Sequence, residues 1–389
     1  MTKRVLFLIS DTGGGHRSGA QAIGAALDGI KGETRYDWRI EDIGTHCTFP
    51  LSQLGPAYSA ALRYAPPVYG ALFHATNGRR RFKSIVRFCE PLYRERLREM
   101  FLTYVPDVIV SVHPLLNHAA LRARADAHIT TPVITVITDL GRVHEAWLVP
   151  EVDAVVVPAP EVYQRAIERG VSPERIFLLG HPVHPKFEDV SSSKMEVRRS
   201  LGLPPDKTIT LLMAGGEGGG KLLPTTLALA RSRLPLGLVV VTGRNAALRT
   251  KLEEIAPSLP VPMTVLGFRN DIPALMRASD LLVTKAGPGT LAEASVAEVP
   301  VVVYDFVPGQ ERGNLDYVRS NGIGVVALTT SEVVSSVARI VQNKERLTAM
   351  RTRQGHIAPR GSARRIADLI ARTALLGTVP VERVAVAVS

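Results

Sequence analysis

The chain of 389 residues is long enough for two domains, each with a hydrophobic core of its own. Its 46% hydrophobic and 21% charged residues exclude a largely disordered chain, and its two cysteines are too few for a disulfide framework or a structural zinc site. The net charge of +11 favours anionic partners. Because no apolar run approaches the roughly 20 residues that span a bilayer, we expect a soluble or peripheral protein.

The first half of the chain alternates β-branched strands with helices. We predict strands at 5–10, 108–112, 132–138 and 154–158. After the first strand, apolar residues recur at spacings of three and four from Ala20 to Ile30, which predicts a helix. Strands separated by helices indicate parallel βαβ units.

An apolar, aromatic-rich segment at 49–77 is followed by a dense basic cluster. The basic residues are Arg79, Arg80, Arg81, Lys83 and Arg87. Such a segment suits an anionic membrane surface, at roughly 1 kcal/mol for each basic residue near the headgroups. A solvated helix face and a nucleic-acid site are the alternatives. The apolar neighbour favours membrane lipid over nucleic acid, because nucleic acid would explain only the arginines.

The sequence becomes polar near residue 186. Residues 187–205 contain a serine triplet and a Pro-Pro pair, so we expect an interdomain linker there. Strands and helices then alternate again. We therefore predict an α/β protein of two Rossmann-like domains, residues 1–186 and 206–352, facing a central cleft. Residues 353–389 are expected to form a C-terminal helix that packs back on the first domain, and a tail.

Three glycine-rich turns follow predicted strands, at 13–15, 215–220 and 287–289. Glycine lets the backbone approach a ligand closely, and the N-terminus of the following helix favours phosphate. The first turn lacks the third glycine of a dinucleotide fingerprint, with Ser18 in its place. The second lacks the Ser or Thr of a P-loop, with Leu222 in its place. Both departures disfavour dinucleotide chemistry and P-loop ATP hydrolysis.

The third turn is the most informative. We expect a strand to end at Lys285 and a helix to begin at Thr290, with Glu293 one turn later. Thr290 and Glu293 fit a capping box, which is a purely structural alternative. Lys285 and the amides of Gly287 and Gly289 also suit a diphosphate, and Glu293 could accept hydrogen bonds from ribose hydroxyls.

These motifs together resemble a known family. In chain order they are GGGH at Gly13–His16, TDL at Thr138–Leu140, HEAW at His144–Trp147, GGEGGG at Gly215–Gly220, GRN at Gly243–Asn245, GF at Gly267–Phe268, KAGPGTLAEA at Lys285–Ala294 and GQERGN at Gly309–Asn314. The set is similar to the monogalactosyldiacylglycerol synthases and the bacterial diacylglycerol glucosyltransferases. It is more distantly similar to the N-acetylglucosaminyltransferase that completes lipid II.

The resemblance implies a GT-B fold and an inverting transfer of galactose or glucose from a UDP-hexose to the 3-hydroxyl of 1,2-diacylglycerol. It implies no cofactor and no catalytic metal, and the sequence contains no Asp-x-Asp motif. The first domain would take the lipid and the membrane, and the second the UDP-sugar. The expected partners are UDP-hexose, diacylglycerol and anionic membrane lipids, without nucleic acid. The expected place is the cytoplasmic side of the cell membrane, as a peripheral protein.

The same resemblance assigns the donor site. The loop at 216–220 would approach the diphosphate, Gly267 and Phe268 the uracil, and Gln310 with Glu311 the hexose. The full donor set is Gly216, Gly218, Gly219, Gly220, Arg244, Asn245, Gly267, Phe268, Lys285, Gly287, Pro288, Gly289, Thr290, Glu293, Gln310, Glu311 and Asn314. Arg244 stands where lysine is common, and Leu140 where some relatives have an aromatic residue.

His16 is the residue that we expect to act as the catalytic base. It follows a strand on a glycine turn, Gly14–Gly15, and its ordinary pKa suits physiological pH. Asp139 could orient a histidine, act as the base itself, or cap a turn. His144 and Trp147 are expected at the acceptor pocket, although Trp147 also fits a core position. A histidine that merely caps the next helix is the alternative for His16.

Four other functions remain open at this point. A transferase of N-acetylglucosamine to a polyprenyl lipid and a nucleotide-sugar epimerase would share the fold and the UDP site. The epimerase would have no use for an apolar and basic first domain. A dinucleotide-dependent oxidoreductase is disfavoured by the incomplete fingerprints, and a non-catalytic sensor by the presence of His16 and Asp139.

Overall fold

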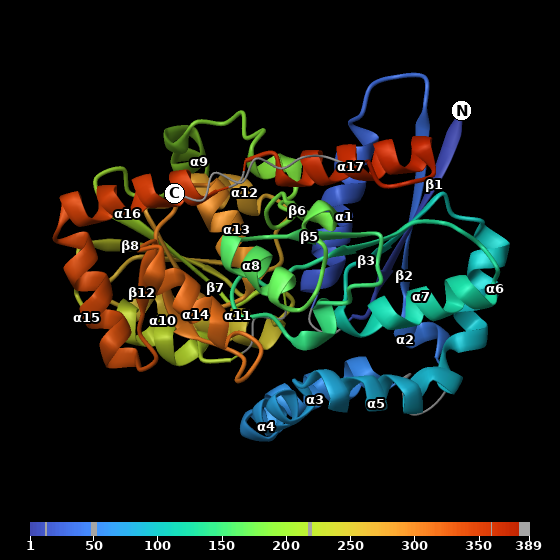
Figure 1. Cartoon of the computed structure of the whole chain (residues 1–389). Coiled ribbons are helices and arrows are strands. Elements are labelled where there is room, and N and C mark those ends of the chain that lie inside the picture. The colour runs from blue at the N-terminus through green and yellow to red at the C-terminus, as the bar shows by residue number, and fades with distance from the viewer. Residues whose placement is uncertain (12–13, 48–52, 217–219, 359, 381–389) are drawn as a thin grey trace. The chain divides into compact units, whose positions relative to one another are not determined.

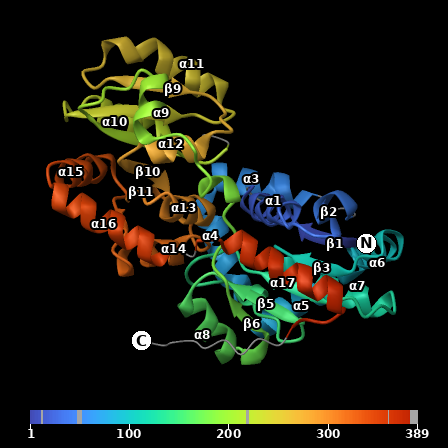
Figure 2. The same ribbon diagram turned by 90° about the horizontal axis from the view of Figure 1, so that it is seen from above.

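The computed structural model describes residues 1–11, 14–47, 53–216, 220–358 and 360–380. They belong to two units (Figures 1 and 2). Unit 1 comprises Met1–Pro185, Pro308–Gln310 and Gly361–Ser389, and unit 2 comprises Lys186–Val307 and Glu311–Arg360. Each unit has a parallel sheet covered by helices, which confirms the predicted α/β class.

The sheet of unit 1 has the strand order β2-β1-β3-β4-β5-β6, and all of its described strands are parallel. The strands are β1 (Thr2–Ile9), β2 (Arg35–Asp42), β3 (Val108–Ser111), β4 (Val133–Val136), β5 (Ala154–Val157) and β6 (Ile176–Leu178). The helices are α1 (Gly15–Asp28), α2 (Ile43–His46), α3 (Leu54–Tyr64), α4 (Pro66–Thr76), α5 (Arg79–Cys89), α6 (Arg94–Tyr104), α7 (Asn117–Asp126), α8 (Pro160–Glu168) and α17 (Ser362–Leu376). β1, β3, β4 and β5 lie where the sequence predicts strands.

Strand β1 is buried on both faces, as its uninterrupted apolar run predicts for a central parallel strand. Leu6 and Leu8 point into a core shared with α6 and α7. Val5, Phe7 and Ile9 point into the opposite core, which α1 and α17 cover. Helix α17 therefore returns from the far end of the chain to pack beside α1 (Figures 1 and 2).

Unit 2 has the strand order β12-β11-β10-β7-β8-β9, again parallel in the part that the structure describes. The strands are β7 (Thr208–Met213), β8 (Leu236–Val241), β9 (Met263–Leu266), β10 (Leu281–Lys285), β11 (Val301–Asp305) and β12 (Gly324–Val326). The helices are α9 (Lys194–Ser200), α10 (Leu222–Ala230), α11 (Ala246–Ile255), α12 (Ile272–Ala278), α13 (Pro288–Val296), α14 (Arg312–Ser320), α15 (Thr330–Val341) and α16 (Lys344–Ile357).

Helix α9 lies inside the segment that the sequence suggests as a linker. Ser193 and Glu196 form a capping box that starts it. Arg198 is buried, and its guanidinium donates to Asp280 at 2.5 Å, which joins α9 to the start of β10. This part of the segment is thus a packed element of unit 2.

Each sheet has one point where the strand order reverses, and in such sheets ligands bind at the carboxyl ends of the strands that flank it. In unit 1 the reversal falls between β1 and β3. In unit 2 it falls between β7 and β10. The loops after these four strands therefore mark one candidate site in each unit.

Candidate functional site

His16 lies at the reversal point of unit 1, directly after β1. Gly14 caps α1 with a φ of 73°, a left-handed conformation that glycine adopts without strain, and His16 is the second residue of the helix. The ring is buried, and its Nδ1 lies 3.1 Å from the hydroxyl of Thr138. Burial lowers the pKa of His16 to about 4, so the imidazole is neutral at physiological pH and can accept a proton.

Two further buried histidines accompany His16. The ring of His113, which follows β3, meets the His16 ring edge to face with centroids 4.6 Å apart. His181, which follows β6, has a buried Nδ1 with no hydrogen-bond partner among the residues that the structure describes. Burial lowers the pKa of His181 to about 4, and burial together with the nearby His16 lowers the pKa of His113. Neither residue was predicted from the sequence, although each follows a parallel strand at its carboxyl end, as His16 does.

Asp139 and Trp147 form a buried pair beside His16. Trp147 Nε1 donates to Asp139 Oδ2 at 2.7 Å, and the indole ring lies 6.0 Å from the His16 ring between centroids. Trp147 is fully buried in the core of unit 1, which is the alternative that the sequence left open for it. Its indole therefore fixes Asp139, and Thr138 supplies the hydroxyl next to His16.

His144 belongs to a loop that is tied to helix α4. Its ring packs against Phe73 with centroids 4.9 Å apart, and its Nδ1 accepts the backbone N–H of Ala146 at 3.1 Å. Burial lowers the pKa of His144 to about 4. The next residue, Glu145, accepts from Arg165 at 2.7 Å and Arg169 at 2.6 Å, a partly buried network that holds the loop in place.

In unit 2, three turns meet at the carboxyl ends of β7, β8 and β10. Gly243 has a φ of 59°, and a Cβ there would lie 2.2 Å from the carbonyl oxygen of Gly216, so only glycine lets these turns touch. The Lys285 side chain runs past Gly215 and Gly287, because a Cβ at either glycine would lie within 3.9 Å of its Cε. An ammonium between glycine turns is an arrangement that suits a diphosphate. Gly218 and Gly219 lie outside the described residues.

Phe268 and Arg244 form an aromatic platform next to these turns. The Arg244 guanidinium lies 4.8 Å above the centroid of the Phe268 ring, which is 52% exposed. The Arg244 backbone N–H donates to the Gly216 carbonyl at 2.8 Å. Asn245 caps helix α11 by accepting from the Leu248 N–H at 3.0 Å, so it shapes the turn. An exposed ring with a cation over it can stack on a planar base.

Helix α13 starts earlier than the sequence suggested. It begins at Pro288 with Gly287 as its N-cap and has no side-chain cap, so the expected start at Thr290 is wrong and the capping box does not form. Proline is favoured at the first position of a helix, which explains the earlier start. Helix capping is therefore excluded as the role of the Glu293 side chain. Burial raises its pKa to about 7.

Glu311 and Asn314 support the loop from within. Glu311 is buried, and its Oε2 accepts the backbone N–H of Val307 at 2.8 Å. Burial raises the pKa of Glu311, and the nearby Lys285 ammonium opposes that rise. Asn314 Nδ2 donates to the carbonyl of Ala286 at 2.8 Å, so it fixes the turn after β10.

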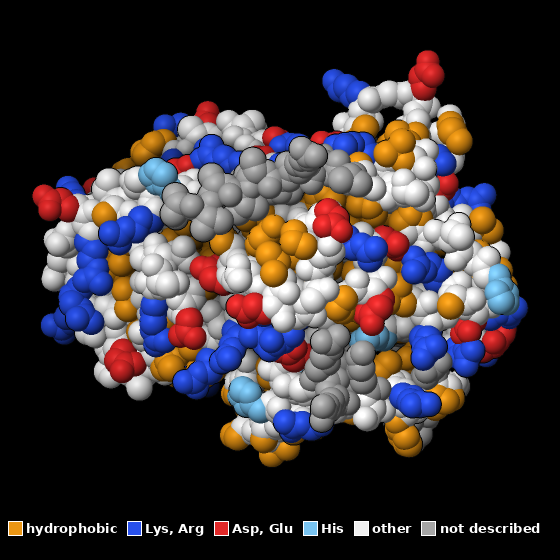
Figure 3. Space-filling model, viewed as in Figure 1, with side chains coloured by type: hydrophobic (Ala, Val, Ile, Leu, Met, Phe, Trp, Pro, Cys, Tyr) orange, Lys and Arg blue, Asp and Glu red, His pale blue; other side chains and the backbone are white. Residues whose placement is uncertain are grey.

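The basic cluster forms helix α5, and apolar side chains gather on the surface over α4 and α5 (Figure 3). Phe88 is 83% exposed, and Arg81 and Arg87 are exposed as well. The side chains of Arg79, Arg80 and Lys83 lie outside the described part of the chain. Among the described residues, no helix is both long and apolar enough to cross a bilayer.

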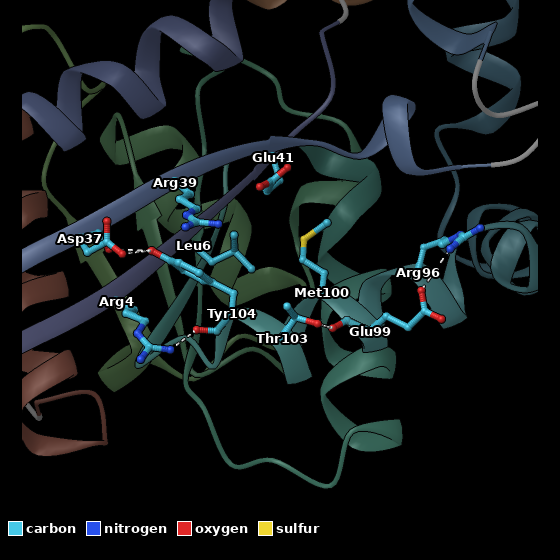
Figure 4. Close-up of a pocket in the computed structure, with 10 residues that line it drawn as sticks. All are labelled: Arg4, Leu6, Asp37, Arg39, Glu41, Arg96, Glu99, Met100, Thr103 and Tyr104. Carbon is cyan, nitrogen blue, oxygen red and sulfur yellow. Dashed lines mark hydrogen bonds and ion pairs between the residues drawn. The ribbon is translucent and has the colours of Figure 1, made fainter.

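A cavity of about 630 Å³ lies elsewhere in unit 1, among β1, β2 and α6 (Figure 4). Arg39 stacks over Tyr104 there at 4.7 Å, and the Tyr104 hydroxyl donates to the Asp37 carbonyl at 2.8 Å. Its arginines are matched by carboxylates, so it has no strong preference for an anion. Within the described ranges, no cluster of three or more His, Cys, Asp or Glu residues is arranged to hold a metal ion.

Both halves of the chain match models of known protein families. Residues 16–183 match the family model described as monogalactosyldiacylglycerol (MGDG) synthase, and residues 210–370 match the glycosyltransferase family 28 C-terminal domain. The chain is 37% identical over 347 residues to probable monogalactosyldiacylglycerol synthase 2, chloroplastic, of Oryza sativa subsp. indica, covering 87% of this chain and 73% of the relative. It is 36% identical over 361 residues to monogalactosyldiacylglycerol synthase 3, chloroplastic, of Arabidopsis thaliana, covering 90% and 76%.

Solved structures share the fold at low sequence identity. MurG of Acinetobacter baumannii matches with a TM-score of 0.62 and 16% identity, covering 95% of this chain and 99% of that one. MnaA of S. aureus, solved with UDP, matches with a TM-score of 0.62 and 14% identity, covering 96% and 97%. These likenesses confirm the predicted GT-B fold class.

Proposed function

Because the chain belongs to the monogalactosyldiacylglycerol synthase family and is a glycosyltransferase, we propose that it transfers galactose from UDP-galactose to the 3-hydroxyl of 1,2-diacylglycerol. The observation that carries this proposal is that each unit has a candidate site at the reversal point of its own sheet. Unit 1 holds a neutral, buried His16, and unit 2 holds glycine turns around Lys285. The names of the relatives favour galactose over glucose as the sugar.

On the acceptor side, neutral His16 takes the proton of the lipid hydroxyl as it attacks the anomeric carbon. The contact with the Thr138 hydroxyl orients the imidazole. To Asp139, which Trp147 holds, we assign the stabilisation of the imidazolium as it forms. A single displacement by the acceptor inverts the anomeric configuration.

On the donor side, Lys285 and the backbone amides of the glycine turns neutralise the charge that develops on the leaving UDP. Phe268, with Arg244 above it, stacks on the uracil. Glu293, which forms no capping box, accepts from the ribose hydroxyls when ionised. Gln310 and Glu311 reach the hexose. This donor site uses no metal and no cofactor.

The acceptor reaches the protein from a membrane. We assign α4 and α5 to a peripheral contact with anionic lipid on the cytoplasmic face of the cell membrane, supported by the exposed Phe88 and by Arg87 beside it.

The deciding experiment incubates the protein with diacylglycerol vesicles and, separately, UDP-galactose or UDP-glucose, and identifies the glycolipid. We expect a β-galactosyl diacylglycerol from UDP-galactose, with the anomeric configuration read by NMR. A glucosyl product would correct the donor, and retention of configuration would overturn the single displacement. No glycolipid, with conversion of UDP-N-acetylglucosamine to its 2-epimer in the absence of lipid, would favour an epimerase instead.

A further inference from the structure

Gln310 is held by two tyrosines of unit 1. The chain leaves unit 2 after Val307, contributes Pro308–Gln310 to unit 1 and returns to unit 2 at Glu311. Within unit 1, the hydroxyl of Tyr58 on α3 donates to Gln310 Oε1 at 3.2 Å, and the hydroxyl of Tyr69 on α4 donates to the same oxygen at 2.9 Å. Two separate helices thus converge on one amide oxygen.

The segment Pro308–Gln310 packs closely against helix α4. A Cβ at Gly70 would lie 2.9 Å from the Cβ of Pro308, and a Cβ at Gly309 would lie 3.0 Å from Phe73. Gly309 also has a φ of 82°, which favours glycine. Glycine on each side of the contact therefore brings the segment close enough for both phenols to reach Gln310.

The two tyrosines also brace each other. Their rings meet edge to face, with centroids 5.3 Å apart, and the Tyr69 ring in turn lies 6.5 Å from that of Phe73. Packing of this kind restricts each phenol to one orientation, so the hydroxyls are held in place before any ligand binds.

The two hydrogen bonds to the Gln310 side-chain amide determine which of its atoms can bind a ligand. A glutamine side chain has one oxygen that accepts two hydrogen bonds and one nitrogen that donates two. Because the two phenols occupy the acceptor capacity of Oε1, Gln310 can meet a ligand only through Nε2. A sugar hydroxyl placed there must accept a hydrogen bond.

We propose that Tyr58 and Tyr69 are positioning residues that orient Gln310, so that its Nε2 donates to a hydroxyl of the donor hexose. This inference rests on the hexose role of Gln310 proposed above. It adds which atom of Gln310 contacts the sugar, and which side chains hold that amide in place.

The experiment compares steady-state kinetics of the full chain and five variants, with UDP-galactose varied on diacylglycerol vesicles. Tyr58→Phe with Tyr69→Phe removes both hydroxyls and keeps both rings. We expect kcat/KM for UDP-galactose to fall by about tenfold or more, because Gln310 loses both hydrogen bonds that orient it. The affinity for UDP, which lacks the hexose, should not change. Tyr64→Phe, on the same helix with a 75% exposed ring, is the matched control and is expected to match the parent.

Two Gln310 variants separate positioning from mere packing. Gln310→Glu keeps an oxygen for both phenols but offers no N–H, so we expect it to lose kcat/KM as Gln310→Ala does while it unfolds at the parent temperature. Adding the two Tyr→Phe changes to Gln310→Ala should lower kcat/KM by less than about twofold, because the tyrosines act through a residue that is already gone.

The outcomes test the hexose role of Gln310 and the positioning role of the two tyrosines separately. Parental kinetics in Gln310→Ala would overturn the hexose role of Gln310 and with it this inference. Impaired Gln310→Ala beside an unimpaired double tyrosine variant would overturn the positioning role alone. Full activity of Gln310→Glu would show that Nε2 does not meet the sugar, and fully additive losses would show that the tyrosines act elsewhere.

Discussion

The hydroxyl of Thr138 lies 3.1 Å from Nδ1 of His16, and this contact joins the loop after β4 to the start of α1, across the position of β3 in the sheet. A buried imidazole is reactive only if its ring is held at one angle and in one tautomer. Thr138 therefore connects the sheet of unit 1 to the chemistry that we propose for His16.

Replacing Thr138 by Val should lower kcat by about fivefold to tenfold, because the hydrogen bond that orients the ring is lost. The KM for UDP-galactose should stay constant, since the donor site that we propose lies in unit 2. Thr138→Ser keeps the hydroxyl and should restore most of the activity. A Thr138→Val protein with the kcat of the parent would remove this contact from the mechanism.

Replacing His16 by Asn should lower turnover by roughly 100-fold or more while UDP binding stays near that of the parent. Calorimetric titration with UDP and glycolipid formation on vesicles measure the two effects separately. Near-parental turnover in a folded His16→Asn protein would exclude His16 as the base.

The buried histidines predict how stability depends on pH. Burial lowers the pKa of His16, His144 and His181 to about 4, from an ordinary 6.5. Between pH 6.5 and 4 the unfolded chain therefore binds protons that the folded chain does not, so the free energy of unfolding falls as the pH drops through this window. A shift of this size corresponds to a loss on the order of 3 kcal/mol for one histidine.

Urea unfolding at pH 7, 5.5 and 4 measures this loss. Carboxylates also titrate near the lower end, so His16→Asn serves as the internal control. The stability difference between the parent and His16→Asn should shift by up to about 3 kcal/mol in favour of the variant from pH 7 to 4. A difference that stays constant across the three pH values would contradict the lowered pKa of His16.

The fold was largely predictable from the sequence because its signals are local. The apolar run of β1 and the glycine turn before His16 each occupy adjacent residues, and both elements lie where expected. The start of α13 was misplaced because the capping-box pattern was preferred to Pro288, although proline is itself a start signal. The capping box at Ser193 was an equally local signal for helix α9 that went unused.

The parts of the candidate sites that were missed depend on tertiary contacts. His113 and His181 lie far from His16 in sequence and join it only through the parallel strand order. The passage of Pro308–Gln310 into unit 1 depends on the close approach of Gly70, which no sequence period encodes.

The raised pKa of Glu293 gives a prediction for donor binding. Burial raises this pKa to about 7, so near neutral pH a substantial fraction of Glu293 is protonated and only the ionised form accepts two ribose hydrogen bonds freely. Affinity for UDP should therefore rise from pH 6 to 8 in the parent and stay nearly flat in Glu293→Gln. Glu293→Ala should weaken binding by about 1.5–3 kcal/mol at pH 8. Equal pH profiles for parent and Glu293→Gln would refute the ribose role.

Two adjacent residues of helix α5, Arg87 and Phe88, allow the electrostatic and the hydrophobic contributions to membrane binding to be measured separately. Phe88→Ser removes an 83% exposed ring, and losing its insertion should weaken binding to neutral and anionic vesicles alike, by about tenfold or more. Arg87→Gln should weaken binding to anionic vesicles alone, by about fivefold for roughly 1 kcal/mol. This second effect should vanish in 1 M salt, where the Debye length is about 3 Å.

Cosedimentation with vesicles of phosphatidylcholine, with and without phosphatidylglycerol, measures both effects. Leu376→Ser, an exposed apolar residue at the end of α17, is the matched control and should bind as the parent does. If α5 instead presents only a solvated face, Phe88→Ser and Arg87→Gln will sediment like Leu376→Ser. That result would move the lipid contact away from α5, because a residue that touches the membrane must change the affinity when its ring or charge is removed.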